Sequence, residues 1–195
     1  LRIALPLVLV PAAASTCFGF AEIARGALLL QTTASATYDS YFLGTVSNDP
    51  DTIYTLFPSL RYTRNAGRAQ LGASAGVAFN RYEKNQDLDS EDLRAHASID
   101  LPTAQGSRLT GSFAADYNES TVIDYTVNDR VATETFSANL GFRYRLGARM
   151  QLSESLGYST SSREIYSDQE TLSNTVTFTY EDFLRGTALD VSHGA

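Results

Sequence analysis

The residues that could do chemistry in this chain are few, and they lie far apart in the sequence. The two histidines, His96 and His193, have no cysteine or second histidine near them, so no zinc-binding spacing is present. An acidic run at 87–92 offers carboxylates for calcium, but its spacing differs from that of an EF-hand loop. Asp116 and Asp124 could act as acid and base, yet we expect one in a strand and the other in a loop. Because the sequence also contains no phosphate-binding loop, we predict a protein that is not an enzyme and binds no metal or cofactor.

The composition limits the class of protein. Of the 195 residues, 43% are hydrophobic and 19% are charged, which is typical of one folded domain rather than a disordered segment or a helical membrane protein. The formal net charge of −7 argues against a nucleic-acid partner. A single cysteine, Cys17, excludes an internal disulfide bond.

The first residues have the pattern of an export signal. Arg2 precedes an apolar run at 3–10, and small residues follow, with Gly19 and Ala21 at the −3 and −1 positions of a cleavage after Ala21. The apolar run is too short to form a membrane-spanning helix. We therefore predict a signal peptide at 1–21, read by the Sec route, and a single domain at 22–195.

Beyond residue 26 the hydrophobic pattern has the period of β-strands rather than helices. In the segment L-R-A-H-A-S-I-D-L (93–101), apolar and polar residues alternate strictly, as in a strand with one apolar and one wet face. We expect eight such strands and the start of a ninth, most of them about 10 to 13 residues long, against roughly 5 to 6 in soluble proteins. The predicted strands are 28–38, 52–64, 70–82, 93–101, 108–118, 135–146, 150–160 and 171–180, with the last beginning near Thr187.

The connections between these strands alternate in length. Short turns at 65–67, 102–106, 147–149 and 182–186 alternate with longer, acidic connections that centre on 47–51, 83–91, 119–130 and 163–170. Outer-membrane β-barrels combine short periplasmic turns, long external loops and two aromatic girdles. Aromatic residues here fall at strand ends beside the long connections (Tyr38, Tyr54, Phe79, Tyr82, Tyr117, Tyr158) and beside the short turns (Tyr62, Phe142, Tyr144, Tyr180).

These features predict an all-β fold, an antiparallel up-and-down transmembrane β-barrel. The apolar positions of 93–101 would face lipid and the polar positions a wet lumen, because only a closed barrel pairs all its backbone groups inside a membrane. The chain ends inside a predicted strand, so we expect a barrel truncated at its C-terminus. Glu154 shares its parity with Leu152 and Leu156, which a bulge, a protonated or interfacial carboxyl, or a wrong parity would explain.

Several segments resemble a known family. The segments "TYDSYFLGTVSNDPDTIYTLFPSLRY" (37–62), "SAGVAFNRYEKN" (74–85) and "DFLRGTALDVS" (182–192) are similar to β-barrel porins found beside exopolysaccharide export genes in Gram-negative bacteria. The resemblance covers the chain from about residue 27 and implies an outer-membrane location. It also implies further strands that close the barrel, and no enzymatic activity.

The first functional hypothesis is therefore an outer-membrane pore or export conduit. Its partners would be outer-membrane lipid, and polysaccharide or small hydrophilic solutes would pass through it. One alternative is a small structural or adhesive barrel that binds partners through its external loops, and a second is a soluble, secreted β-sandwich. The lumen-lining candidates, chosen because rings of charge select what passes a pore, are Arg61, Arg94, His96, Asp100, Asp116, Asn139 and Arg143.

Overall fold

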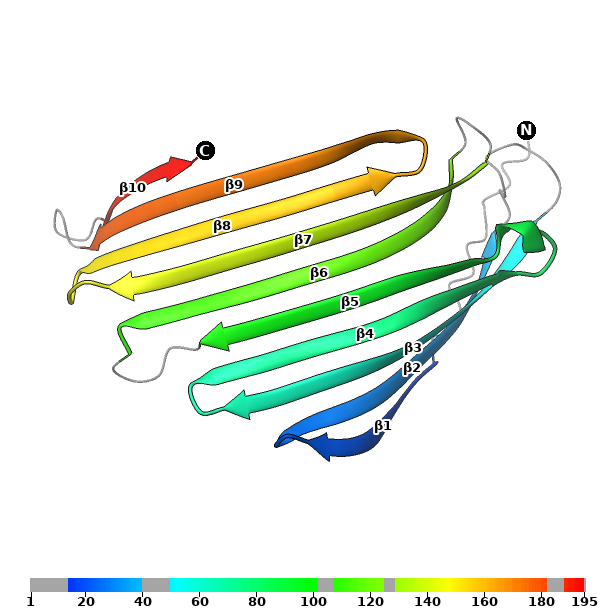
Figure 1. Cartoon of the computed structure of the whole chain (residues 1–195), viewed down its shortest axis with the longest axis horizontal. Helices are drawn as coiled ribbons and strands as arrows, with labels where there is room; N and C mark the ends of the chain where they lie inside the picture. The colour runs from blue at the N-terminus through cyan, green and yellow to red at the C-terminus, as the bar shows by residue number, and fades with distance from the viewer. Residues whose placement is uncertain (1–13, 40–49, 102–106, 125–128, 182–187, 195) are drawn as a thin grey trace, which may run out of the picture.

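A single antiparallel sheet makes up the described part of the chain, which in this computed structural model comprises residues 14–39, 50–101, 107–124, 129–181 and 188–194. Ten strands follow one another in the sheet in sequence order, so each strand pairs with its neighbours along the chain (Figure 1). The strands are β1 (Ala14–Ile23), β2 (Gly26–Asp39), β3 (Asp51–Ala66), β4 (Ala69–Tyr82), β5 (Ser90–Leu101), β6 (Leu109–Asp124), β7 (Asp129–Arg145), β8 (Met150–Arg163), β9 (Tyr166–Glu181) and β10 (Ala188–Gly194), with a 3₁₀ turn, η2 (Gln86–Leu88), between β4 and β5. The predicted all-β, up-and-down antiparallel arrangement is confirmed.

The register gives the sheet two chemically different faces. Ala73 pairs with Ala97, which pairs with Ala115, while in the adjacent row Ser74 pairs with His96 and His96 with Asp116. Since neighbouring partners point to the same side of a sheet, the predicted alternation is confirmed strand by strand. We call the two sides the apolar face and the polar face. Residues on the apolar face include Leu30, Leu56, Leu60, Phe79, Leu93, Ile99, Phe113, Phe136, Leu140, Leu156, Leu172 and Phe178.

The apolar face is not covered by another layer among the described residues. All ten described strands belong to one sheet, and large apolar side chains on this face are open to the surroundings, with Leu172 68% exposed. A soluble sandwich would require a second sheet packed on this face. Among the described hydrophobic residues, those that are buried are Ala78 and Val131.

The apolar face has a regular width. Tyr54 and Tyr62 are eight residues apart on β3, and the same spacing separates Phe136 from Tyr144 on β7. At about 3.3 Å per residue, this spacing corresponds to about 27 Å along a strand. Tyr82, which we predicted among the aromatic residues of this band, instead pairs with Ile53 on the polar face.

Two of the predicted long connections are largely strand, so these predictions are wrong. In the segment 119–130, β6 continues to Asp124 and pairs with β7 from Asp129. In the segment 163–170, Arg163 pairs directly with Tyr166 across a two-residue turn. In both segments the apolar residues are adjacent (Val122 and Ile123, Ile165 and Tyr166), so hydropathy does not alternate there although the backbone pairing continues.

The sheet also contains one strand more than we predicted. β1 pairs with β2 through a tight turn at Ala24 and Arg25, both of which have positive φ values (50° and 64°), as two-residue hairpins require. β1 overlaps the predicted signal peptide and runs across the expected cleavage position after Ala21. Cleavage there would remove most of β1 and leave β2 as the edge of the sheet. The uncleaved chain can therefore form β1, and the cleaved chain cannot. The signal peptide stays a prediction.

Glu154 lies on the apolar face, as its parity predicted. It pairs with Phe142 on one side and Val176 on the other, and the irregularity in β8 falls later, between Ser161 and Arg163. A bulge at Glu154 and a wrong parity are thereby excluded. Glu154 is four residues from both Met150 and Tyr158, so it lies at the middle of the band.

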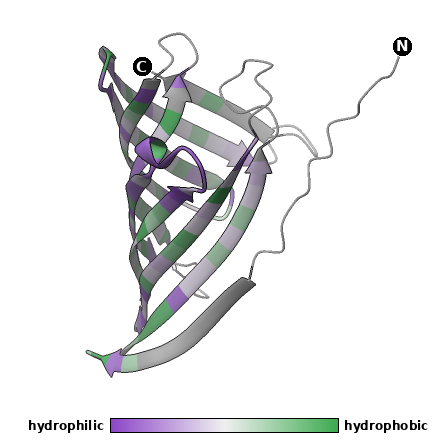
Figure 2. Ribbon diagram, turned by 90° about the vertical axis from the view of Figure 1, so that its right-hand side faces the viewer, coloured by the Kyte–Doolittle hydropathy of each residue, from purple (hydrophilic) through white to green (hydrophobic). Residues whose placement is uncertain are grey.

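The sheet is open and curved. β1 and β10 are its two edges, each paired on one side, so the described residues do not close a barrel. Figure 2 shows the strands bending into a trough rather than a flat layer. Curvature and twist of this kind are what the strands of a barrel wall require.

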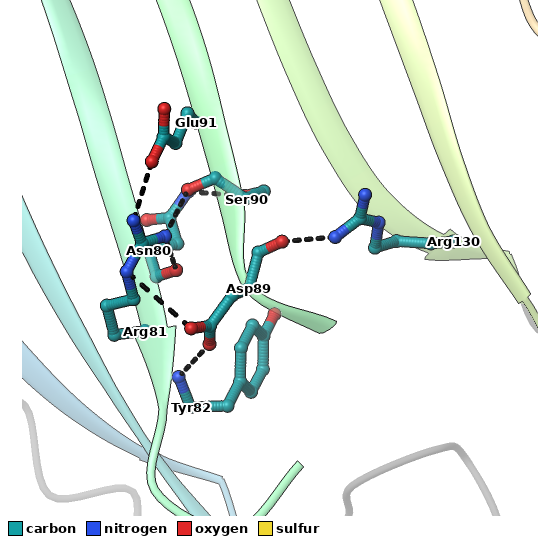
Figure 3. A network of polar contacts seen from close by, with 7 residues as sticks. All are labelled: Asn80, Arg81, Tyr82, Asp89, Ser90, Glu91 and Arg130. Carbon is teal, nitrogen blue, oxygen red and sulfur yellow. Dashed lines mark hydrogen bonds and ion pairs between the residues drawn. The ribbon is translucent and has the colours of Figure 1, made fainter. Parts of the chain in front are cut away.

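A polar network fixes the β4–β5 hairpin at the end of the sheet opposite the short turns (Figure 3). Arg81 on β4 forms ion pairs with Glu91 (2.6 Å) and Asp89 (3.6 Å), and Asp89 accepts a hydrogen bond from the Tyr82 N–H (2.9 Å). Arg130 on β7 donates to the Asp89 carbonyl oxygen, which ties this hairpin to the next. These contacts join the connection between β4 and β5 to both of its strands and to β7.

Asp51 anchors the same hairpin to β3. Its side chain is 1% exposed and accepts hydrogen bonds from the Lys84 N–H (3.1 Å) and from the backbone (3.1 Å) and side-chain (2.8 Å) amides of Asn85. Burial raises the pKa of this carboxyl, but the hydrogen bonds from Asn85, Lys84 and Thr52 together outweigh burial and lower it below its ordinary value. The N–H groups that donate to Asp51 thus stabilise the charged form of its carboxyl group.

Candidate functional site

All seven residues predicted to line a lumen lie on the polar face. The pairings that place them there link Arg61 to Ser74, Arg94 to Asn118, His96 to Asp116, Asp100 to Ser112, Asn139 to Gly157 and Arg143 to Ser153. They do not form one cluster, because they are spread over β3, β5, β6 and β7. His193, the other histidine, pairs with Val176 and so falls on the apolar face.

The polar face is the hollowed side of the sheet. The hollows of the described surface are lined chiefly by polar-face residues of neighbouring strands. The largest, of about 840 Å³, lies toward the short turns and includes Arg61, Gln70, Ser98 and Asp100. A second, of about 370 Å³, lies over the middle of β3–β6, and we call it the central hollow. Its lining includes Phe57, Ser74, Gly76, Arg94, His96 and Asp116.

A histidine–carboxylate pair lies in the central hollow. His96 Nδ1 is 2.7 Å from Asp116 Oδ1, and the two side chains are 42% and 51% exposed. The contact follows from the register, because the two residues pair directly across β5 and β6. A carboxylate accepts but does not donate, so a neutral His96 must carry its proton on Nδ1 and leave Nε2 free as an acceptor.

Ser74 pairs with His96 on the other side, which places the residue types of a nucleophile, a base and an orienting acid in one row. The structure forms the His96–Asp116 contact but, among the described contacts of these residues, no hydrogen bond between Ser74 and His96. Acyl transfer also needs free N–H groups for an oxyanion, whereas strand N–H groups are used in the sheet ladder. Ser74 also stands in a G-x-S-x-G sequence (72–76), but that sequence lies inside β4 rather than at the strand-to-helix turn of a nucleophile elbow.

Phe57 is a residue of the site that the sequence analysis did not single out. It shares its parity with Thr55, Ser59 and Arg61, so an aromatic ring lies on the polar face, half-buried. The ring leans over Gly76, where an added Cβ would come within 2.9 Å of Phe57 Cζ. The Arg94 guanidinium carbon is 5.5 Å from the ring centroid, which is within cation–π range. The sequence could have identified Phe57, because it is an apolar residue at a polar position of the alternation.

The described residues contain no group of three or more side chains arranged to hold a metal ion. No helix in the described part of the chain is long and apolar enough to cross a membrane.

No family model, curated protein or solved structure is detectably similar to this chain. The resemblance to exopolysaccharide-associated porins stays a prediction.

Proposed function

We propose that this chain forms the wall of an outer-membrane β-barrel pore, with lipid on its apolar face and water on its polar face. The observation that carries the proposal is the uncovered apolar face, which extends across the sheet with a constant width. Its length of about 27 Å along a strand, projected at the usual tilt of about 40°, gives a height of roughly 20 Å, which approaches the apolar band of such barrels, about 25 Å tall. The concave polar face would then line the path of hydrophilic solutes.

The two open edges require further strands in this proposal. Unpaired backbone groups in lipid cost several kcal/mol each, so a sheet in a membrane has to close. The strands that complete the barrel would come from the same chain or a second copy. Even without β1, which the predicted cleavage would remove, a wall of β2–β10 exceeds the roughly eight strands whose interior side chains fill, which favours a lumen over a solid barrel.

Chemical labelling on neighbouring residues tests this proposal. In a Cys17→Ser background, Ser98→Cys in the membrane-inserted protein should react with a water-soluble thiol reagent. Ala97→Cys should be protected from it, and a fluorophore there should be quenched by a lipid-borne quencher. If position 97 is protected from both water and lipid probes, its face packs against protein and the proposal is wrong.

The adhesive alternative draws support from one observation, the rigid β4–β5 hairpin. The network around Asp89 and Asp51 orders a connection that a passive pore would not need to fix. Single-channel recording in a planar bilayer separates the two functions, because the pore predicts stepwise conductance and a solid adhesive barrel predicts none.

A further inference from the structure

We propose that the central hollow binds a sugar acid, a ring-shaped polyol that carries a carboxylate. This inference rests on the proposed function, since it treats the polar face as the wet wall of a pore. It makes that pore selective, with a binding subsite partway along its length.

Arg94 is the anion receptor of this subsite. Its side chain is exposed, it forms no ion pair among the described residues, and its guanidinium lies against the ring of Phe57. A planar guanidinium binds a carboxylate through two parallel charge-assisted hydrogen bonds. The Phe57 ring positions this cation and gives the hollow one apolar side.

The His96–Asp116 pair supplies hydrogen-bond acceptors for hydroxyl groups. With Asp116 on Nδ1, Nε2 of the imidazole is directed away from the carboxylate and is an acceptor whenever the ring is neutral, and Asp116 Oδ2 has lone pairs to spare. Hydroxyl groups of a polyol can donate to both. A second carboxylate could not, so this half of the hollow favours hydroxyls where Arg94 favours an anion.

The spacing of the two halves fits one ring. Arg94 and His96 are two residues apart on one face of β5, which corresponds to about 7 Å along the strand. That distance is close to the span from the carboxylate of a hexuronic acid across its ring to the hydroxyls on the far side. A neutral sugar would leave the Arg94 half unused, and a small anion would leave the His96–Asp116 half unused.

Tryptophan fluorescence provides the test, because the chain contains no tryptophan. Phe57→Trp keeps an aromatic ring in the hollow and creates a single intrinsic probe; Tyr54→Trp places the same probe on the apolar face. In the protein reconstituted in lipid vesicles, glucuronate should change the Phe57→Trp emission saturably. Glucose should require at least about a tenfold higher concentration, and Arg94→Gln in the Phe57→Trp protein should abolish that difference. Tyr54→Trp should respond to neither.

Quenching of the same two variants keeps the two proposals separate. Iodide should quench Phe57→Trp, and brominated lipid should quench Tyr54→Trp. If this pattern holds but glucuronate and glucose act alike or not at all, the subsite is wrong and the pore stands. If brominated lipid quenches Phe57→Trp instead, the pore proposal fails.

Equilibrium dialysis of the unsubstituted protein guards against a variant that does not fold. The unsubstituted chain should retain labelled glucuronate at saturable occupancy, and Arg94→Gln should weaken retention at least about tenfold. Unchanged retention in Arg94→Gln would overturn the assignment of the anion receptor.

Discussion

The polar face has two walls that share one backbone design and differ in chemistry. On β3–β6 it holds Arg61, Arg94, His96, Asp100 and Asp116, which we call the charged wall. On β8 and β9 the corresponding positions hold small hydroxyl residues, which we call the hydroxyl wall. These are Ser153, Ser155, Ser159 and Ser161 on β8, and Thr171, Ser173, Thr175, Thr177 and Thr179 on β9.

The difference teaches that facing water and selecting a solute are separate demands. A hydroxyl group can donate and accept and tolerates a water partner, so a row of serines and threonines needs no particular arrangement. Charged groups are arranged in specific positions instead, as the His96–Asp116 contact and the Arg94–Phe57 contact show. We infer that the hydroxyl wall passes polar solutes while the charged wall discriminates among them.

The largest expected effect is a loss of stability when arginine is placed on the apolar face, and it tests whether that face contacts lipid behind both walls. Ala97→Arg behind the charged wall and Leu156→Arg behind the hydroxyl wall should each lower the free energy of unfolding by about 2–4 kcal/mol, as basic residues do in mid-membrane. The neighbouring changes Ser98→Arg and Ser155→Arg should cost far less, since they add charge to a wet face. Equilibrium unfolding from lipid vesicles measures all four, and equal losses at 97 and 98 would contradict the assignment of faces.

A smaller effect is expected at the anchored end of the charged wall. Asp51→Asn should destabilise the β4–β5 hairpin by about 1–3 kcal/mol, because the amide cannot accept every hydrogen bond that the buried carboxylate accepts. The pKa of Asp51 lies below its ordinary value of 3.8, so its contribution is complete above that value. The contribution is lost as the pH falls through the lowered pKa.

Hydrogen exchange of the Lys84 and Asn85 amides measures this opening. Protection should be constant from neutral pH to about pH 5, after correction for intrinsic exchange, and should fall only in stronger acid. Ser162→Ala, which removes a 2.7 Å hydrogen bond to Asp168 in the exposed β8–β9 hairpin, is the matched control and should change exchange little. Loss of protection between pH 7 and pH 5 would show that another group holds the hairpin.

A smaller difference between the two walls is expected in how substitutions change the ion selectivity of the pore. Asp100→Asn removes a carboxylate from the charged wall and should shift the preference of the pore toward anions by about two- to threefold at low salt. Thr177→Asn introduces the same amide on the hydroxyl wall and should leave the reversal potential unchanged. Equal shifts in both variants would mean that the walls do not differ in discrimination.

The smallest effect is expected within the hydroxyl wall itself. Ser155→Ala should change the free energy of unfolding by no more than about 0.5 kcal/mol, since it removes a water-exposed hydroxyl from a regular strand position. Thermal unfolding of the purified protein measures the change. A large loss would show that the hydroxyls pair with one another as specifically as His96 and Asp116 do.

The sequence predicted the faces of this sheet well because alternation is a local property. Ala97 and Ser98 lie on opposite faces because they are adjacent in one strand, whichever strand pairs with them. The same reasoning placed Glu154 correctly. The length of β6 beyond Asn118 was not predictable in this way, because its last residues do not alternate: Val122 and Ile123 are adjacent apolar residues among polar ones. There only backbone pairing with β7 marks the strand.

The site was less accessible to sequence analysis than the fold. His96 and Asp116 were each predicted on the polar face, but their contact depends on the register between β5 and β6. Alternation fixes the face on which each residue lies but not its partner on the next strand, so the sequence alone did not give this register. Phe57 was missed because its hydrophobicity suggested the apolar face, although its parity placed it on the other.

The meander order of the strands has a consequence for how such a wall grows. Because each strand pairs with the one before it in the chain, assembly can proceed as a zipper that adds one hairpin at a time. Deleting or duplicating a whole hairpin, such as β8–β9, leaves the direction and the parity of every other strand unchanged. Removing a single strand would instead force its neighbours to run parallel. The hairpin is thus the unit that can be added to or removed from this wall without reversing the direction or the faces of the other strands.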